Sequence, residues 1–107
     1  MKAHTKETQM SISPEKAVHL LKEGNNRFIE NKTISRDLLD QVKDTSIGQF
    51  PFATILSCID SRVSSELIFD QGIGDIFSAR VAGNFVNEDI LGSMEFACTL
   101  AGTTVVL

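Results

Sequence analysis

The feature that most constrains the fold is a mostly apolar run at residues 52–57, in which apolar and polar positions do not alternate. Such a run has the length of a strand and is typical of a strand buried on both faces, as in a parallel sheet. Shorter strand-like segments follow at residues 75–79 and 103–107, and segments with helical patterns separate the strands or precede them. Strands that alternate with helices predict an α/β fold, with a parallel β-sheet core and flanking helices.

Local signals place the starts of three helices. Ser13 followed by Pro14 indicates an N-cap and a first helical residue, although Gly24 weakens the expectation for the last turn of this helix. Ser35 with Asp37 indicates a cap for a second, short helix, and Asn87 indicates a third helix whose first turn is acidic. The third helix is expected to turn one face to the core, formed by Ile90, Met94, Ala97, Cys98 and Ala101.

The chain is expected to form one domain with three parts. Residues 1–12 are polar and unpatterned and predict a flexible N-terminal arm, residues 13–46 predict a helical arm, and residues 50–107 predict the α/β core. Ten basic and fourteen acidic residues give a net charge of −4, so we expect neither nucleic acid nor a membrane surface as a partner. Without a signal peptide or an apolar segment of membrane length, a cytoplasmic location is expected.

Three side chains of different chemistry, Cys58, Asp60 and Arg62, follow the first predicted strand. They lie at its carboxyl end, where open α/β sheets place their ligand sites, and a continued extended backbone would put all three on one side. Zinc accepts thiolate and carboxylate ligands, and a neighbouring arginine favours both ionised forms. The alternative interpretation is a buried structural cysteine beside an ion pair in a turn, and the short C-x-D-x-R pattern alone supports both about equally.

Four segments extend this pattern to nearly the whole chain. Residues 57–63 contain C-x-D-S-R, and residues 21–28, 49–52 and 80–84 stand in matching order and spacing. From about residue 13 to residue 107 the sequence resembles the β-class carbonic anhydrases. The resemblance implies the first part of a β-carbonic anhydrase fold, a zinc cofactor, and the reversible hydration of carbon dioxide to bicarbonate.

The resemblance also implies roles for the three residues after the first strand. Cys58 would be the first zinc ligand. Asp60 would either accept a hydrogen bond from zinc-bound water while paired with Arg62, or ligate zinc itself in a closed form. Zinc would lower the pKa of its water far below the value in bulk water, to about 7, so that hydroxide is present at neutral pH to attack carbon dioxide.

Further residues are matched to the substrate pocket by the same resemblance. Gln49 would orient the substrate beside the metal, Phe77 would line an apolar carbon dioxide pocket, and Gly83 with Asn84 would form a loop close to that pocket. The N-terminal helices would embrace a neighbouring subunit, which implies a homodimer or a higher homo-oligomer.

The sequence does not contain the family's second group of zinc ligands. The family supplies a His and a second Cys from an H-x-x-C segment after the third strand, and residues 1–107 hold no such segment. We do not expect His4, His19 or Cys98 to replace it, because each suits a structural role better. We therefore expect a chain cut before that segment, with a catalytically inactive or interaction fragment as the alternative. Relatives that hydrolyse carbonyl sulfide or carbon disulfide offer another substrate class.

Overall fold

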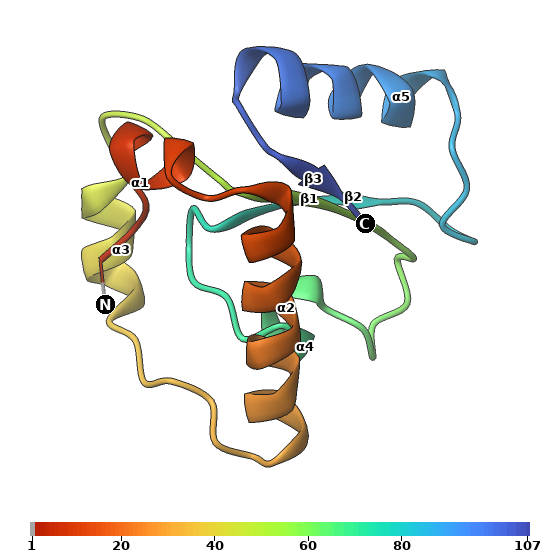
Figure 1. Ribbon diagram of the computed structural model, residues 1–107. Helices are drawn as coiled ribbons and strands as arrows, with labels where there is room; N and C mark the ends of the chain where they lie inside the picture. The colour runs from red at the N-terminus through yellow and green to blue at the C-terminus, as the bar shows by residue number, and fades with distance from the viewer. Residues whose placement is uncertain (1) are drawn as a thin grey trace.

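The computed structural model describes residues 2–107 and has a parallel sheet enclosed between helices (Figure 1). The sheet has three strands in the order β2-β1-β3, all parallel. They are β1 (Ala53–Ser57), β2 (Ile76–Arg80) and β3 (Val105–Val106). This arrangement confirms the α/β class, and β1 lies in the apolar run from which it was predicted.

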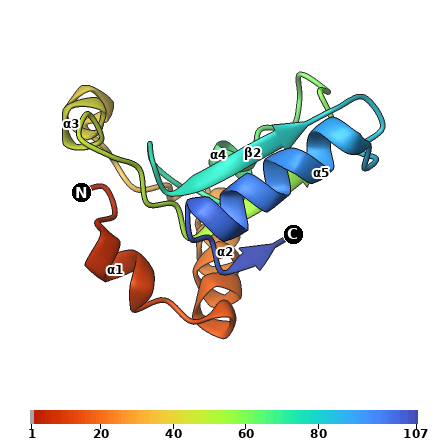
Figure 2. The same ribbon diagram turned by 90° about the horizontal axis from the view of Figure 1, so that it is seen from above.

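Helices cover both faces of this sheet. The helices are α1 (Lys6–Met10), α2 (Pro14–Ile29), α3 (Leu38–Asp44), α4 (Ser65–Ile68) and α5 (Glu88–Glu95), which continues as the π-helical turn η1 (Phe96–Leu100). Figures 1 and 2 show α5 along one face of the sheet and α2 with α4 on the other. No helix within residues 2–107 is long and apolar enough to cross a membrane.

The predicted helix starts are confirmed by their capping bonds. The side chain of Ser13 accepts a hydrogen bond from the amide of Lys16, and Pro14 occupies the first turn of α2. Asp37 and Asn87 cap α3 and α5 in the same manner. Each bond satisfies an amide that has no partner within its helix, which is why these residue types mark helix starts.

The core lies between α2 and the sheet. Its buried members are Ile12, Ala17, Leu21, Phe52, Ala53, Ile55 and Ile76. The helix α2 continues past Gly24 to Ile29 because this glycine permits a close approach: a Cβ atom there would lie 1.7 Å from the carbonyl oxygen of Phe69. Gly24 therefore serves packing between α2 and α4 rather than ending the helix.

The N-terminal segment differs from the unpatterned arm predicted for residues 1–12. It contains α1, which Thr5 caps through a reciprocal pair of bonds with Thr8. The buried side chain of Gln9 donates from Nε2 to the carbonyl oxygens of Pro51 (2.7 Å) and Ala101 (2.6 Å). Ile12 of the same segment is also buried in the core, but the two bonds of Gln9 come from a polar side chain and leave no apolar pattern.

The face of the third helix was predicted only in part. Ile90 and Ala97 are buried, whereas Cys98 is exposed, so its predicted core position is wrong. The wider π-helical turn begins at Phe96 and changes the direction in which later side chains point.

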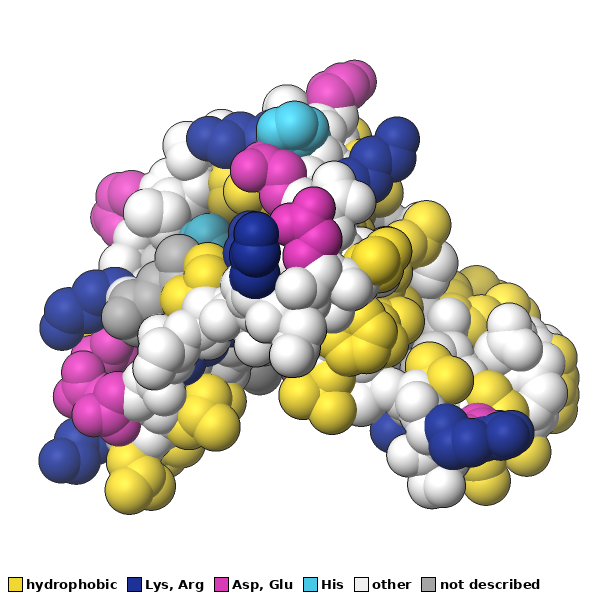
Figure 3. Space-filling view, turned by 90° about the horizontal axis from the view of Figure 1, so that it is seen from below, with side chains coloured by type: hydrophobic (Ala, Val, Ile, Leu, Met, Phe, Trp, Pro, Cys, Tyr) yellow, Lys and Arg dark blue, Asp and Glu magenta, His cyan; other side chains and the backbone are white. Residues whose placement is uncertain are grey.

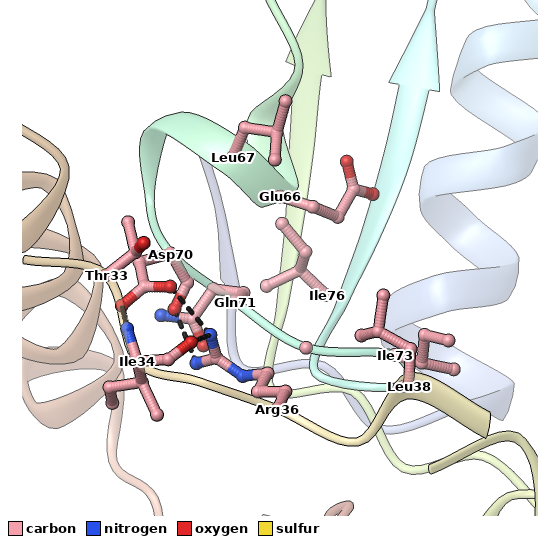
Figure 4. Close-up of a pocket in the computed structure, with 12 residues that line it drawn as sticks. Thr33, Ile34, Arg36, Leu38, Glu66, Leu67, Asp70, Gln71, Ile73 and Ile76 are labelled. Carbon is pink, nitrogen blue, oxygen red and sulfur yellow. Dashed lines mark hydrogen bonds and ion pairs between the residues drawn. The ribbon is translucent and has the colours of Figure 1, made fainter. Parts of the chain in front are cut away.

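Asp70 ties the helical arm to the core. Its buried carboxylate accepts hydrogen bonds from Arg27 Nε (2.6 Å), Arg36 Nη1 (2.6 Å) and the amide of Ile34 (3.0 Å). Figure 4 shows Arg36 reaching toward Asp70 at the edge of a pocket between the segment of residues 33–38 and α4. Burial alone would raise the pKa of Asp70, but the bonds from Arg27, Ile34 and Arg36 outweigh it and hold this pKa below its usual range.

We expect Asp70→Asn to lower the free energy of unfolding by about 3 kcal/mol, because it leaves two guanidinium groups without their counter-charge. Because the folded-state pKa of Asp70 is depressed, its stabilisation is present above the unfolded-state pKa of about 3.9 and is lost as pH falls through the folded-state value. The free energy of unfolding of Asp70→Asn should therefore fall less between pH 7 and pH 3 than that of the wild type. Urea unfolding of the full-length gene product between pH 7 and pH 3 measures both effects.

Glu30→Gln is the matched control, since the Glu30–Lys32 pair is exposed and spans 3.9 Å. It should unfold as the wild-type protein does. An Asp70→Asn protein with the wild-type urea midpoint at pH 7 would show that this cluster does not anchor the arm.

Many large apolar side chains remain exposed. Figure 3 shows hydrophobic side chains gathered around a hollow on one face, with most of the visible charged groups to one side of it. On α3 and on the α5–η1 helix, Leu39, Leu91 and Leu100 are 77%, 58% and 78% exposed. Exposed apolar side chains that form a patch are candidates for a contact with another protein.

Candidate metal centre

The Cys58 site lies in the loop that follows β1, at the carboxyl end of the sheet. Ser57 is the last residue of β1 and stands opposite Arg80, the last residue of β2. The loops after both strands therefore begin side by side, as expected for parallel strands. This placement brings the segment after Cys58 next to the segment that contains Gly83.

A turn, rather than an extended backbone, brings Asp60 to Arg62. The amide of Arg62 donates to Asp60 Oδ1 (2.8 Å), and the amide of Val63 donates to the carbonyl oxygen of Asp60 (3.2 Å). The extended backbone that would have put Cys58, Asp60 and Arg62 on one side therefore does not continue through this segment. An aspartate side chain that accepts an amide two residues ahead favours a turn over a strand.

The Asp60 and Arg62 side chains form a two-bond ion pair. Arg62 Nε donates to Oδ1 (3.0 Å) and Nη2 donates to Oδ2 (2.7 Å), so the guanidinium engages both carboxylate oxygens. Hydrogen bonds from the side chain and then the amide of Arg62 lower the pKa of Asp60, and the charge of Arg80 adds to this. The same pairing raises the pKa of Arg62. Asp60 is thus held as a carboxylate.

The Cys58 thiol is surrounded by backbone amides. The amide of Gly83 lies 3.4 Å from Sγ and donates to it, and Gly83 has a positive φ of 79°. The hydrogen bond from Gly83, followed by those from the amides of Asp60 and Ile59, lowers the pKa of Cys58, although burial and the charge of Asp60 oppose this. A thiolate is the form of cysteine that binds metal.

The structure does not bring Gln49 and Phe77 to this site within one chain. Gln49 is exposed and precedes β1, whereas Cys58 follows it, so the two residues lie at opposite ends of a five-residue strand. Phe77 lies in β2 opposite Thr54, and its ring meets the edge of Phe96 with centroids 6.2 Å apart. It lines a groove of about 770 Å³ between β2 and α5.

The donor set near Cys58 fits part of a zinc site. Cys58 and Asp60 supply a soft and a hard ligand type that zinc accepts. Within residues 2–107, no group of three His, Cys, Asp or Glu side chains could hold a metal ion. The other candidate donors have different neighbours: His4 lies near Asp75, His19 near Glu23, and Cys98 near Thr103.

Arg80 is the residue of this site that sequence reasoning missed. Its guanidinium donates to the carbonyl oxygens of Cys58, Asp60 and Val63. The signal was present, because Arg80 begins the segment of residues 80–84 that stands at the family's spacing directly after the second predicted strand. Bonds to backbone carbonyls leave no trace in the partner's sequence, so the contact itself was not visible.

Comparison with known proteins decides the family. A family model described as carbonic anhydrase matches residues 53–107, which include the whole sheet and the Cys58 loop. The chain belongs to the carbonic anhydrase family. It is 40% identical over 98 residues to carbonic anhydrase 2 of Mycobacterium tuberculosis, covering 91% of this chain and 47% of that protein. It is 37% identical over 89 residues to a carbonic anhydrase of Mycolicibacterium smegmatis, covering 82% and 43%.

The structural comparison identifies the β class. The β-carbonic anhydrase CcaA superimposes with a TM-score of 0.60 and 30% identity over 83% of this chain and 45% of that one. A Coccomyxa β-carbonic anhydrase shares the fold, with a TM-score of 0.53 and 23% identity. The chain spans about half the length of the curated relatives, 47% in the first case. The predicted family and the incomplete β-carbonic anhydrase fold are both confirmed.

Proposed function

We propose that this protein is a zinc-dependent carbonic anhydrase that converts carbon dioxide and water reversibly to bicarbonate. The observation that carries the proposal is the Cys58 thiol, which receives the Gly83 amide beside an aspartate paired with Arg62. Family membership supports the reaction class. The chain covers only part of its relatives, so the ligands that complete the site would come from outside residues 1–107.

Three residues of the loop after β1, namely Cys58, Asp60 and Arg62, have proposed roles. When bound, zinc supplies the Lewis acidity that makes hydroxide available near neutral pH. Cys58 would hold the metal as a thiolate. Asp60, whose two carboxylate oxygens accept bonds from Arg62, would offer a hydrogen-bond acceptor to water at the metal. In a closed form without that pairing, Asp60 would itself ligate zinc.

We assign Gln49, Phe77 and Gly83 to substrate binding. Gly83 lies beside Cys58 in the same chain. Gln49 and Phe77 lie away from this cysteine, so we propose that they contribute to the site of a neighbouring copy in a homodimer. The exposed apolar side chains of α3 and α5 support such an assembly. The proposed location is cytoplasmic.

Two alternatives are tested with the main proposal. A catalytically inactive interaction fragment is favoured by the ligand count, since the donors near Cys58 number fewer than the three that a catalytic zinc site normally uses. Hydrolysis of carbonyl sulfide or carbon disulfide would use the same scaffold with a different pocket entrance. Either compound can replace carbon dioxide as the substrate in the stopped-flow measurements described next.

Residues 1–107 by themselves are expected to hold zinc weakly and to lack measurable carbon dioxide hydration, because Cys58 and Asp60 are too few ligands. They are also expected to be marginally stable or to aggregate, because β3 is an edge strand and large apolar side chains on α3 and α5 are exposed. Stopped-flow hydration with added zinc tests this, beside a protein extended through an H-x-x-C segment and the following helix. The extended protein should gain both metal and activity.

Robust zinc-dependent turnover by residues 1–107 alone would contradict this assignment of ligands. An extended protein that binds zinc but hydrates no carbon dioxide would favour one of the two alternatives.

A further inference from the structure

Arg80 binds the loop of the proposed metal centre at three points. Its Nε atom donates to the carbonyl oxygen of Cys58 (2.8 Å), and Nη2 donates to those of Asp60 (2.7 Å) and Val63 (2.6 Å). The three carbonyls belong to residues at the start, middle and end of the segment 58–63, which carries the Cys58 thiol and the Asp60–Arg62 pair. One side chain on β2 therefore contacts the start, middle and end of the loop that follows β1.

Few other bonds hold this loop. Within it, the amides of Arg62 and Val63 both donate to Asp60, and the amide of Gly83 reaches Cys58 Sγ from outside. The loop residues from Ser61 to Val63 are exposed, so water competes for their backbone groups. A planar guanidinium with several fixed donors loses little freedom in making three bonds and can orient three peptide groups together.

The base of Arg80 is itself fixed. It is the last residue of β2 and pairs in register with Ser57, and the amide of Val81 donates to the carbonyl oxygen of Ser57 (3.1 Å). The guanidinium thus extends from a rigid strand end toward the adjacent loop. Support of this kind can fix the direction of the Cα–Cβ bonds of Cys58 and Asp60, and hence where their side chains point.

We propose that Arg80 is a positioning residue of the metal centre, which holds the Cys58–Asp60–Arg62 loop in the form that can bind zinc. The inference rests on the proposed function for its catalytic consequence. Its structural part, the order of the loop, concerns residues 58–63 alone. Arg80 itself contacts no metal and no substrate in this role.

The loop part is tested by hydrogen exchange in the metal-free full-length gene product. In Arg80→Ala, the amides of Arg62 and Val63 should exchange about 10-fold faster, as expected for a local opening that costs less free energy. Arg80→Lys should recover only part of the protection, because an ammonium group cannot span three carbonyls. Millimolar ethylguanidinium added to Arg80→Ala should restore protection. Lys22→Ala removes an exposed positive charge elsewhere and should change nothing.

The catalytic part is tested by the rate at which a chelator removes zinc and by kcat. Arg80→Ala should lose zinc about 10-fold faster and show a kcat about 10-fold lower, the usual effect of removing an outer support of a metal site. Asp70→Asn weakens the fold away from the loop and should leave zinc release in native buffer unchanged. This control separates positioning from general stability.

Unchanged exchange at Arg62 and Val63 in Arg80→Ala, together with wild-type zinc release, would overturn the inference. So would a loss of zinc in Asp70→Asn equal to that in Arg80→Ala. A different result would count against the proposed function: the wild-type full-length protein would bind no zinc and hydrate no carbon dioxide. The exchange rates would then still decide whether Arg80 orders the loop.

Discussion

Cys58→Ser is expected to reduce carbon dioxide hydration by the full-length gene product to the buffer background. A serine hydroxyl does not ionise near neutral pH and cannot replace a thiolate as a zinc ligand. It also loses the thiolate that the Gly83 amide stabilises. Stopped-flow hydration with a pH indicator measures the effect.

Cys98→Ser is the matched control for this variant. Cys98 is the only other cysteine in the chain, and it is exposed on η1 near Thr103. We expect the Cys98→Ser protein to keep the wild-type hydration rate. Equal rates for Cys58→Ser and the wild type would remove Cys58 from the catalytic site.

Arg62→Ala is expected to retain zinc but lose about 10-fold or more of the hydration rate. Without the guanidinium, the Asp60 carboxylate is free to turn toward the metal and to occupy the coordination position that catalysis needs open. Elemental analysis and stopped-flow kinetics on one preparation separate the two effects.

Arg62→Lys tests whether the two-bond geometry matters, since lysine keeps the charge but cannot engage both oxygens of Asp60 in the same way. The hydration rate of Arg62→Lys should lie between those of Arg62→Ala and the wild type. A wild-type hydration rate in Arg62→Ala would show that the pairing of Asp60 with Arg62 has no part in the reaction.

The parts of the fold that sequence could predict depend on local chemistry. Ser13, Asp37 and Asn87 each cap a helix through a bond to an amide three residues ahead, so the signal and its effect lie in the same short segment. The strand β1 was visible because burial on both faces leaves an apolar run. The family resemblance extended these local signals to a metal centre.

The parts that sequence could not predict depend on long-range polar contacts. Gln9 is a polar residue in a polar segment, yet its side chain is buried. It donates hydrogen bonds to the carbonyl oxygens of Pro51 and Ala101, which lie 42 and 92 residues away in the sequence. Arg80 likewise binds carbonyl oxygens 17 to 22 residues earlier in the chain. Every residue carries a carbonyl group, so neither partner set has a sequence pattern.

The turn at Asp60 shows a different limit. The sequence suggested that Cys58, Asp60 and Arg62 would share one side if the backbone stayed extended, whereas Asp60 and Arg62 meet in a turn. Spacing of two residues fits both geometries, and only the hydrogen bond from the Arg62 amide to Asp60 distinguishes them.

The zinc content of the purified full-length gene product and of its Cys58→Ser variant tests the central claim most directly, namely that Cys58 is a metal ligand. Elemental analysis gives zinc per chain after dialysis against a weak chelator. We predict close to one zinc per chain in the wild-type and Cys98→Ser proteins, and almost none in Cys58→Ser. Zinc near one per chain in a folded Cys58→Ser protein would contradict the claim and place the metal elsewhere.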